Sequence, residues 1–160
     1  MVRPVTTGDA AAIAEIYTHY ILNTVITFEE VPVDAKEMES RIRKVTASYP
    51  WLVDEEEGLV MGYAYASRWG ERASYRHSAA ATVYLRPDAH GRGIGSELYG
   101  ALLADLRARA IHTVLGGISL PNEKSQGLHE KFGFRKVSHL TEVGCKFGRW
   151  IDVGYWQLML

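Results

Sequence analysis

The sequence has a single cysteine and no long apolar run. Cys145 is the only thiol among 160 residues, so an internal disulfide framework and a cysteine-based zinc site are excluded. No stretch approaches the roughly 20 apolar residues of a membrane span. Residues 1–9 also lack the basic and apolar segments of a secretory signal. We therefore expect a cytoplasmic protein that does not bind a membrane.

An excess of charge of either sign is also missing. Eighteen basic residues and 19 acidic residues give a formal net charge of −1, and neither sign forms a long run. The sequence therefore lacks the basic patch that nucleic-acid-binding proteins carry. The six histidines show no zinc-type spacing such as His-Glu-x-x-His, so we expect no metal. The length suits one domain over residues 1–160, with a small soluble molecule as its partner.

Hydrophobic periodicity predicts alternating strands and helices. A short strand over residues 2–5 precedes a helix capped by Asp9, and Asp34 opens a second helix. Apolar runs at 51–53 and 59–67 flank a polar turn, which indicates an antiparallel hairpin. The later elements are expected at 82–85 (strand), from about 94 (helix), 113–118 (strand), 122–132 (helix), 134–140 (strand) and 153–160 (strand). This order predicts an α/β fold with one mixed sheet and helices packed on it.

A glycine-rich turn follows the strand at 82–85. Gly91, Gly93 and Gly95 alternate just before the next helix begins. Such a turn leaves backbone N–H groups free at a helix N-terminus, where the helix dipole also favours an anion. We therefore predict a phosphate-binding turn, with a glycine-rich connection that binds nothing as the alternative.

Two common nucleotide motifs do not fit this turn. The dinucleotide pattern G-x-G-x-x-G/A fails in both frames, because Ser96 and Leu98 stand where its last glycine or alanine belongs. The Walker pattern fails because Ala101 stands where its lysine is needed. Nicotinamide, flavin and nucleoside triphosphate ligands are therefore poor candidates.

Two segments resemble the cofactor elements of the GNAT acyltransferase superfamily: "VYLRPDAHGRGIGSELYGALL" and "SLPNEKSQGLHEKFGF". His90 departs from the motif, which usually has arginine or glutamine there. The resemblance implies acetyl-CoA as cosubstrate and a GNAT fold: a mixed, mostly antiparallel sheet with a central βαβ cofactor-binding unit and flanking helices. The cofactor contacts that it implies are Val83, Tyr84, Leu85, Gly91, Arg92, Gly93, Ile94, Gly95, Ser96, Asn122 and Lys131.

Nearly the whole chain is similar to one group within that superfamily. The segments "HYILNTVITFEEVP", "YPWLV", "GLHEKFGF" and "VGCKFGRWIDVGYWQLML" resemble the phosphinothricin and methionine-sulfoximine N-acetyltransferases. The resemblance implies a homodimer that acetylates the α-amino group of phosphinothricin, methionine sulfoximine, an arsenic analogue or a similar small amino acid. The alternatives are a GNAT transferase for a different amine and an acetyl-CoA-binding sensor without turnover.

Acetyl transfer needs a neutral amine, a donor to the developing oxyanion and an acid for the leaving thiolate. The resemblance implies that the N–H of Leu85 polarises the thioester and that His129 is the acid; a surface histidine without a catalytic part is the alternative. The resemblance also implies a glutamate base three residues before Val83, where this chain has Ala80. The candidate carboxylates for a base that acts through water are Glu29, Glu30 and Glu71. Otherwise the enzyme captures the neutral fraction of its amine.

The residues expected on the substrate side are Phe28, Glu29, Trp69, Arg72, Tyr75, Arg76, Ala80 and Lys146. An arginine pairs bidentately with a carboxylate or phosphinate, and the resemblance favours Arg72; solvated arginines are the alternative. The aromatic residues fit an apolar wall, although such residues are often simply core. Lys146 is expected to meet an anionic substrate or a partner subunit, with a plain surface lysine as the alternative.

Overall fold

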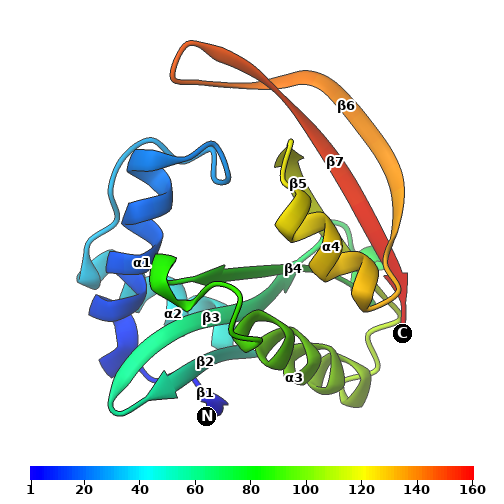
Figure 1. Ribbon diagram of the computed structural model, residues 1–160. Coiled ribbons are helices and arrows are strands. Elements are labelled where there is room, and N and C mark those ends of the chain that lie inside the picture. The colour runs from blue at the N-terminus through cyan, green and yellow to red at the C-terminus, as the bar shows by residue number, and fades with distance from the viewer.

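The computed structural model describes residues 1–160 and places them around one seven-stranded sheet in the order β1-β2-β3-β4-β5-β7-β6 (Figure 1). The strands are β1 Val2–Pro4, β2 Trp51–Glu56, β3 Leu59–Arg68, β4 Ser78–Leu85, β5 Thr113–Leu120, β6 Arg135–Lys146 and β7 Arg149–Met159. The helices are α1 Ala10–Asn23, α2 Ala35–Thr46, α3 Ile94–Ala108 and α4 Glu123–Lys131. The predicted α/β fold with a mixed sheet is confirmed.

The sheet is parallel at one place only, and there it opens. All neighbouring strands pair antiparallel except β4 and β5, whose pairing covers only Ser78–Ala80 against Thr113–Leu115. Beyond these segments β4 stays paired with β3 as far as Leu85, and β5 stays paired with β7 as far as Leu120. The facing edges of β4 and β5 are therefore left without a strand partner.

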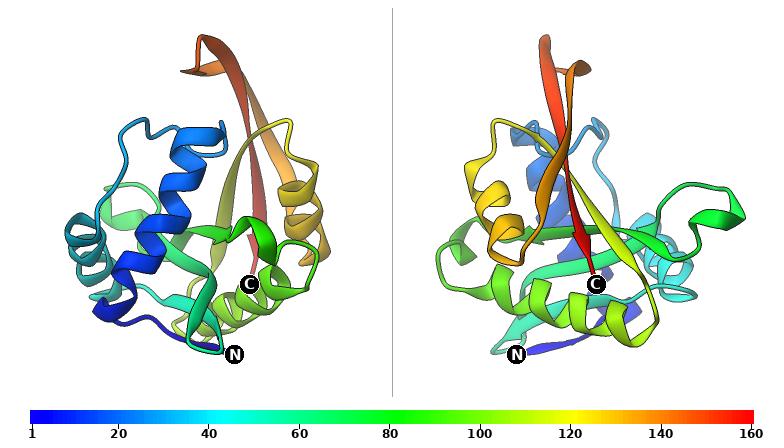
Figure 2. Two further views of the ribbon diagram at one scale, coloured as in Figure 1. Left: turned by 60° about the vertical axis from the view of Figure 1, so that its left-hand side comes forward. Right: turned by 90° about the vertical axis from the view of Figure 1, so that its right-hand side faces the viewer.

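Helices cover both faces of the sheet (Figure 2). On one face α1 and α2 bury Ile13 and Met38 in a cluster with Tyr63 of β3. On the other face α3 buries Leu98 and Leu102, which recur at helical spacing. Burying each such side chain stabilises the fold by about 2 kcal/mol. None of the helices has the length and apolar character needed to cross a membrane.

The last two strands form a long hairpin that projects from the body of the molecule (Figure 1). The sequence predicts strands over 134–140 and 153–160, but β6 continues to Lys146 and β7 begins at Arg149. Most β6 side chains are exposed, so the alternation that marks a half-buried strand is weak there. Similarly, the sequence predicts that this strand begins at 82, but β4 begins at Ser78. The prediction missed its first residues because they include three alanines, which have little β propensity.

The two predicted helix caps have different outcomes. The Asp34 carboxylate accepts the Glu37 N–H at 2.8 Å, so the predicted cap of α2 is confirmed. Asp9 is the N-cap residue of α1 as predicted, but its side chain makes no cap bond to the helix. The Asp9 carboxylate instead accepts the Thr6 N–H at 2.7 Å and pairs with Arg3 at 2.8 Å, which ties β1 to the turn before α1.

Candidate functional site

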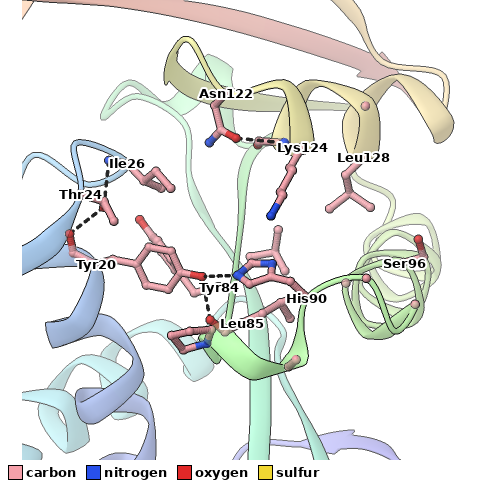
Figure 3. Close-up of a pocket in the computed structure, with 18 of the residues that line it drawn as sticks. Tyr20, Thr24, Ile26, Tyr84, Leu85, His90, Ser96, Asn122, Lys124 and Leu128 are labelled. Carbon is pink, nitrogen blue, oxygen red and sulfur yellow. Dashed lines mark hydrogen bonds between the residues drawn. The ribbon is translucent and has the colours of Figure 1, made fainter.

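A cavity of about 670 Å³ lies beside the region where β4 and β5 separate (Figure 3). Its wall comes from α1, the end of β4, the glycine turn and α4. Tyr20 lines it from α1, and Asn122 and Leu128 line it from the α4 side. The cavity therefore joins segments that are far apart in the sequence.

The glycine turn gives this cavity an anion-binding wall. Gly93 caps α3 at a φ of 87° and Gly91 has a φ of 78°, in the left-handed region that favours glycine. A Cβ atom at either position would meet nothing within 4 Å, so both glycines face open space. The first N–H groups of α3 have no acceptor within the helix and lie at the positive end of its dipole. The turn is therefore suited to a phosphate.

The free edge of β4 forms a second wall. The Arg86 N–H donates to the Met61 carbonyl of the neighbouring segment at 2.9 Å. Because backbone groups alternate in direction along an antiparallel ladder, those of Val83 and Leu85 point away from β3, toward the free edge. The Tyr20 hydroxyl donates to the Leu85 carbonyl at 2.7 Å, which leaves the Leu85 N–H for a ligand. An extended ligand with amide groups can pair here as an added strand does.

His90 connects the glycine turn to both α1 and β4. Its Nε2 lies 3.1 Å from the Tyr20 hydroxyl (Figure 3). Since the Tyr20 proton is donated to Leu85, the His90 Nε2–H is the donor in this contact. Burial lowers the pKa of His90, and the charges of Lys124 and His19 lower it further. The residue that departs from the GNAT motif therefore has a structural bond of its own.

Basic side chains differ in how they meet the cavity. Lys131 lines it, and its Nζ donates to Ser96 Oγ at 2.9 Å, beside the start of α3. Lys124 also lines the cavity and points into it (Figure 3). Arg92 instead donates to Glu56 at 2.6 Å, so its side chain is engaged outside the cavity. Lysines of α4 therefore supply the positive charge that complements the turn.

A smaller cavity of about 90 Å³ continues between the separated strands. It is lined by residues 81–84 of β4 and 117–119 of β5. Ile26, Asn122 and Ser125 line both cavities. A ligand in the larger cavity can therefore extend a short group into the smaller one, which we call the chamber.

Comparisons with known proteins agree with this geometry. Residues 2–154 match the model of the acetyltransferase (GNAT) domain. The phosphinothricin N-acetyltransferase of Streptomyces viridochromogenes is 38% identical over 156 residues, 98% of this chain and 85% of that protein. The L-methionine sulfoximine/L-methionine sulfone acetyltransferase of Salmonella typhimurium is 36% identical over 157 residues, 96% and 90% of the two chains. A Sinorhizobium meliloti phosphinothricin acetyltransferase, solved in complex with acetyl-CoA, has a TM-score of 0.97 and 35% identity, and the similarity covers 100% and 88% of the chains.

The chain belongs to the GNAT acetyltransferase family. The family predicted from the motifs is thus confirmed, and the matched residues include the glycine turn, both cavities and α4. The fold of this acetyltransferase is that of solved GNAT structures. No group of three or more histidine, cysteine, aspartate or glutamate side chains is arranged to hold a metal ion.

His129 lies on α4, where it is buried and lines the chamber of the acetyltransferase. Its Nδ1–H donates to the Ser125 carbonyl at 2.7 Å, so its Nε2 accepts the Tyr99 hydroxyl proton at 2.8 Å. Burial lowers the pKa of His129 and raises the pKa of Tyr99. This bonding describes a neutral imidazole. The role of His129 as the acid for the thiolate stays a prediction.

No carboxylate lines either cavity. Glu29 forms a bidentate pair with Arg41 at 2.8 Å and also accepts the Tyr17 hydroxyl proton. The pKa of Glu29 is lowered, chiefly by Arg41. Ala80 lies on β4 between Ser67 of β3 and a residue of β5. The other two candidate bases, both exposed, are Glu30 and Glu71. The structure thus brings none of the three candidate glutamates into the chamber.

The expected substrate contacts other than Ala80 are spread over three segments, and none of the expected contacts lines either cavity. The loop between β3 and β4 carries the exposed residues Arg72, Tyr75 and Arg76 and the half-buried Trp69. Phe28 is 43% exposed on the loop between α1 and α2. Lys146 is buried near the end of the hairpin, where its Nζ donates to the Thr27 carbonyl at 2.8 Å. Its ammonium is therefore bound within the protein rather than at the chamber.

Three residues of the site were not predicted from the sequence. Tyr20 and Tyr99 lie on apolar helix faces, where aromatic residues indicate core packing. Lys124 lies in a polar helix and is indistinguishable there from a solvated lysine. The contacts of Tyr20 with Leu85 and His90 join distant parts of the chain. No local pattern indicates such contacts.

Proposed function

We propose that this acetyltransferase transfers the acetyl group of acetyl-CoA to the α-amino group of a small amino acid. The proposed acceptors have a second polar or anionic head, as phosphinothricin, methionine sulfoximine and arsenic analogues have. The observation that carries the proposal is one cavity that joins the glycine turn to the free edge of β4 and opens toward the chamber. By name, the relatives act on compounds of this class.

The residues around the larger cavity fit acetyl-CoA. The N–H groups of 91–95 are suited to the diphosphate, and Lys124 and Lys131 add positive charge. The free backbone groups of Val83 are suited to the amides of the pantetheine arm, near the side chain of Asn122. Acetyl-CoA supplies the acetyl group as a thioester.

The Leu85 N–H is the proposed donor to the oxygen that gains negative charge in the reaction. The ladder with β3 points this N–H toward the free edge, and Tyr20 holds the adjoining Leu85 carbonyl at 2.7 Å. The N–H is therefore oriented before the reaction begins, which is the condition for effective oxyanion stabilisation. His129 is the proposed acid for the leaving thiolate. Its lowered pKa makes the protonated ring a stronger acid but a less populated one.

The acceptor amine must lose its proton without a carboxylate in the chamber. We propose that the enzyme captures the neutral fraction of the amine, with water taking the proton. An amine whose pKa lies two units above the ambient pH is about 1% neutral, which costs about 2.7 kcal/mol. This route slows catalysis at neutral pH and makes the rate rise with pH until the amine is neutral.

Thiol release from acetyl-CoA tests the proposal. The panel contains L-phosphinothricin, L-methionine sulfoximine, L-methionine sulfone and the common L-amino acids, with the D-enantiomers as controls. We expect release with one or more of the L-compounds that have a polar γ-head, and at least tenfold less with their D-enantiomers. Equal rates for both enantiomers, or release only with polyamines or protein N-termini, would point to a GNAT transferase for a different amine.

A second candidate function is an acetyl-CoA sensor without turnover. Ala80 favours it, because the β4 position at which the family resemblance implies a base has no proton chemistry here. A sensor binds acetyl-CoA in titration calorimetry yet releases no thiol with any amine. Titration calorimetry and the thiol-release assay together therefore distinguish the two functions.

We further propose that the enzyme is a homodimer formed through the β6–β7 hairpin and works in the cytoplasm. The hairpin exposes six large apolar side chains, with Trp150 67% exposed and Phe147 58% exposed; exposed apolar patches of this kind mark protein interfaces. The single cysteine suits a reducing compartment. Sedimentation should show a dimer, and Trp150→Ser should shift it toward the monomer.

A further inference from the structure

Lys146 is a buried lysine that the proposed chemistry does not use. It is the last residue of β6 and only 2% exposed, although its neighbours Cys145 and Phe147 are exposed. Burying an ammonium is costly unless it is paired, and burial lowers the pKa of Lys146. Its partners are the Thr27 carbonyl at 2.8 Å and the face of the Phe147 ring, 5.0 Å from Nζ. The buried ammonium is therefore held by a residue that is 119 positions away in the sequence.

Thr27 belongs to the loop over residues 24–34, which connects α1 to α2 and has no regular structure. Its backbone is held by Lys146 on one side, and its hydroxyl lies 2.7 Å from the Tyr17 hydroxyl of α1 on the other. The preceding residue, Ile26, accepts a hydrogen bond from Ser119 of β5 at 3.3 Å. The loop is thus fixed by α1, by β5 and by the hairpin together.

The next residue, Phe28, packs on the same end of the hairpin. A Cβ atom at Gly144 would lie 2.4 Å from the Phe28 ring, so the ring occupies the space that any other residue at 144 would fill. Gly144 and Lys146 point to the same face of β6 because they are two residues apart. Both contacts therefore hold one short stretch of the loop, 27–28, against the hairpin.

This stretch adjoins the site. Ile26 lines both the cofactor cavity and the chamber, and it directly precedes the residues that the hairpin holds. We propose that Lys146 is a positioning residue: its ammonium fastens the loop between α1 and α2 to the hairpin and thereby sets the position of Ile26 at the mouth of the chamber. Lys146 acts on acceptor binding without touching the substrate.

The inference rests on the proposed function, and Lys146→Met tests it, because methionine keeps an unbranched apolar stem and removes the donor. We expect the KM for the acceptor amino acid to rise at least tenfold, with kcat and the KM for acetyl-CoA changed less than threefold. Lys44→Met, at an exposed position on α2, is the matched control and should leave all three constants unchanged. Lys146→Arg, which keeps the charge and the donors, should restore part of the lost affinity.

Hydrogen exchange gives a second readout that does not depend on catalysis. In Lys146→Met the amides of residues 24–31 should exchange at least tenfold faster, while those of β3 and α3 keep their protection. Should that variant fail to fold, Gly144→Ala displaces Phe28 instead, and the double variant with Phe28→Ala should then behave like Phe28→Ala alone.

Unchanged loop exchange together with an unchanged acceptor KM would overturn the inference, as would a uniform loss of protection throughout the protein. If the wild type acetylates no amine, the proposed function fails, and the exchange measurement alone still decides whether Lys146 fastens the loop.

Discussion

The cofactor side and the acceptor side of the site are built in different ways. The cofactor side is one continuous segment, β4, the glycine turn and α3, joined by α4, and its binding groups are mainly backbone N–H groups. The proposed acceptor side is assembled from the loop between α1 and α2, the loop between β3 and β4, and the hairpin, and the contacts that join these segments are made by side chains such as Phe28 and Lys146. Local sequence therefore encodes the first side, whereas long-range packing decides the second.

The largest expected effect is on acetyl-CoA binding at the glycine turn. Gly93→Val should weaken acetyl-CoA binding by about 100-fold, which corresponds to the loss of about 3 kcal/mol from two hydrogen bonds to a charged group. The added side chain fills the open space over the turn and disfavours the φ of 87°. Titration calorimetry measures the change.

Gly58→Val is the control for backbone strain. Gly58 has a φ of 83° and, like Gly93, would place a Cβ atom in open space, but it lies in the turn between β2 and β3. Both variants should lose similar thermal stability, and only Gly93→Val should lose acetyl-CoA. Equal affinity losses would mean that the effect of Gly93 is strain rather than anion binding.

A carboxylate introduced at position 80 tests whether the acceptor side lacks a base. Ala80→Glu should raise kcat/KM at neutral pH by about tenfold and move the rise of the rate to lower pH. A well-positioned base typically contributes about 100-fold or more, and a newly introduced carboxylate is expected to supply part of that. The pH profile of thiol release measures both changes. If the rate and profile stay unchanged, position 80 does not face the acceptor amine.

The sequence predicts the cofactor side better than the acceptor side. Contiguous residues predict the glycine turn, the helix that begins at Ile94 and the GNAT family. The structure has the turn and the helix at these positions, and the family model matches the chain. The Tyr20–Leu85 bond and the Lys146–Thr27 bond join residues 65 and 119 positions apart. No periodicity encodes such pairs, and a buried lysine in an exposed hairpin looks like a solvated one. The acceptor side was therefore predicted as a set of candidates rather than as a site.

A smaller effect is expected at the loop between β3 and β4. Arg72→Ala should raise the KM for an anionic acceptor by about threefold, since an exposed ion pair contributes about 0.2–1 kcal/mol. Arg76→Ala, four residues along the same exposed loop, is the comparison. A larger effect for Arg76 than for Arg72 would move the recognition of the anionic head to the other arginine.

The smallest effect concerns acid stability at the boundary between the two sides. Burial lowers the pKa of His129 below its ordinary 6.5, so the unfolded chain binds a proton that the folded protein resists. Stability should therefore fall as the pH drops below about 6.5 and level off below the folded pKa. His129→Gln should flatten this part of the profile of urea unfolding against pH. An identical slope in both proteins would show that the ring is not buried in its neutral form.

Coupled turnover tests most directly whether this acetyltransferase transfers the acetyl group to a small amino acid. Acetyl-CoA is mixed with enzyme and L-phosphinothricin or L-methionine sulfoximine at neutral pH, while thiol release and the N-acetylated product are quantified together. We predict equal amounts of thiol and product with one or both acceptors, and no release without an acceptor. Tight binding of acetyl-CoA with no thiol release for any amino acid would contradict the account and leave a cofactor-binding protein without transfer.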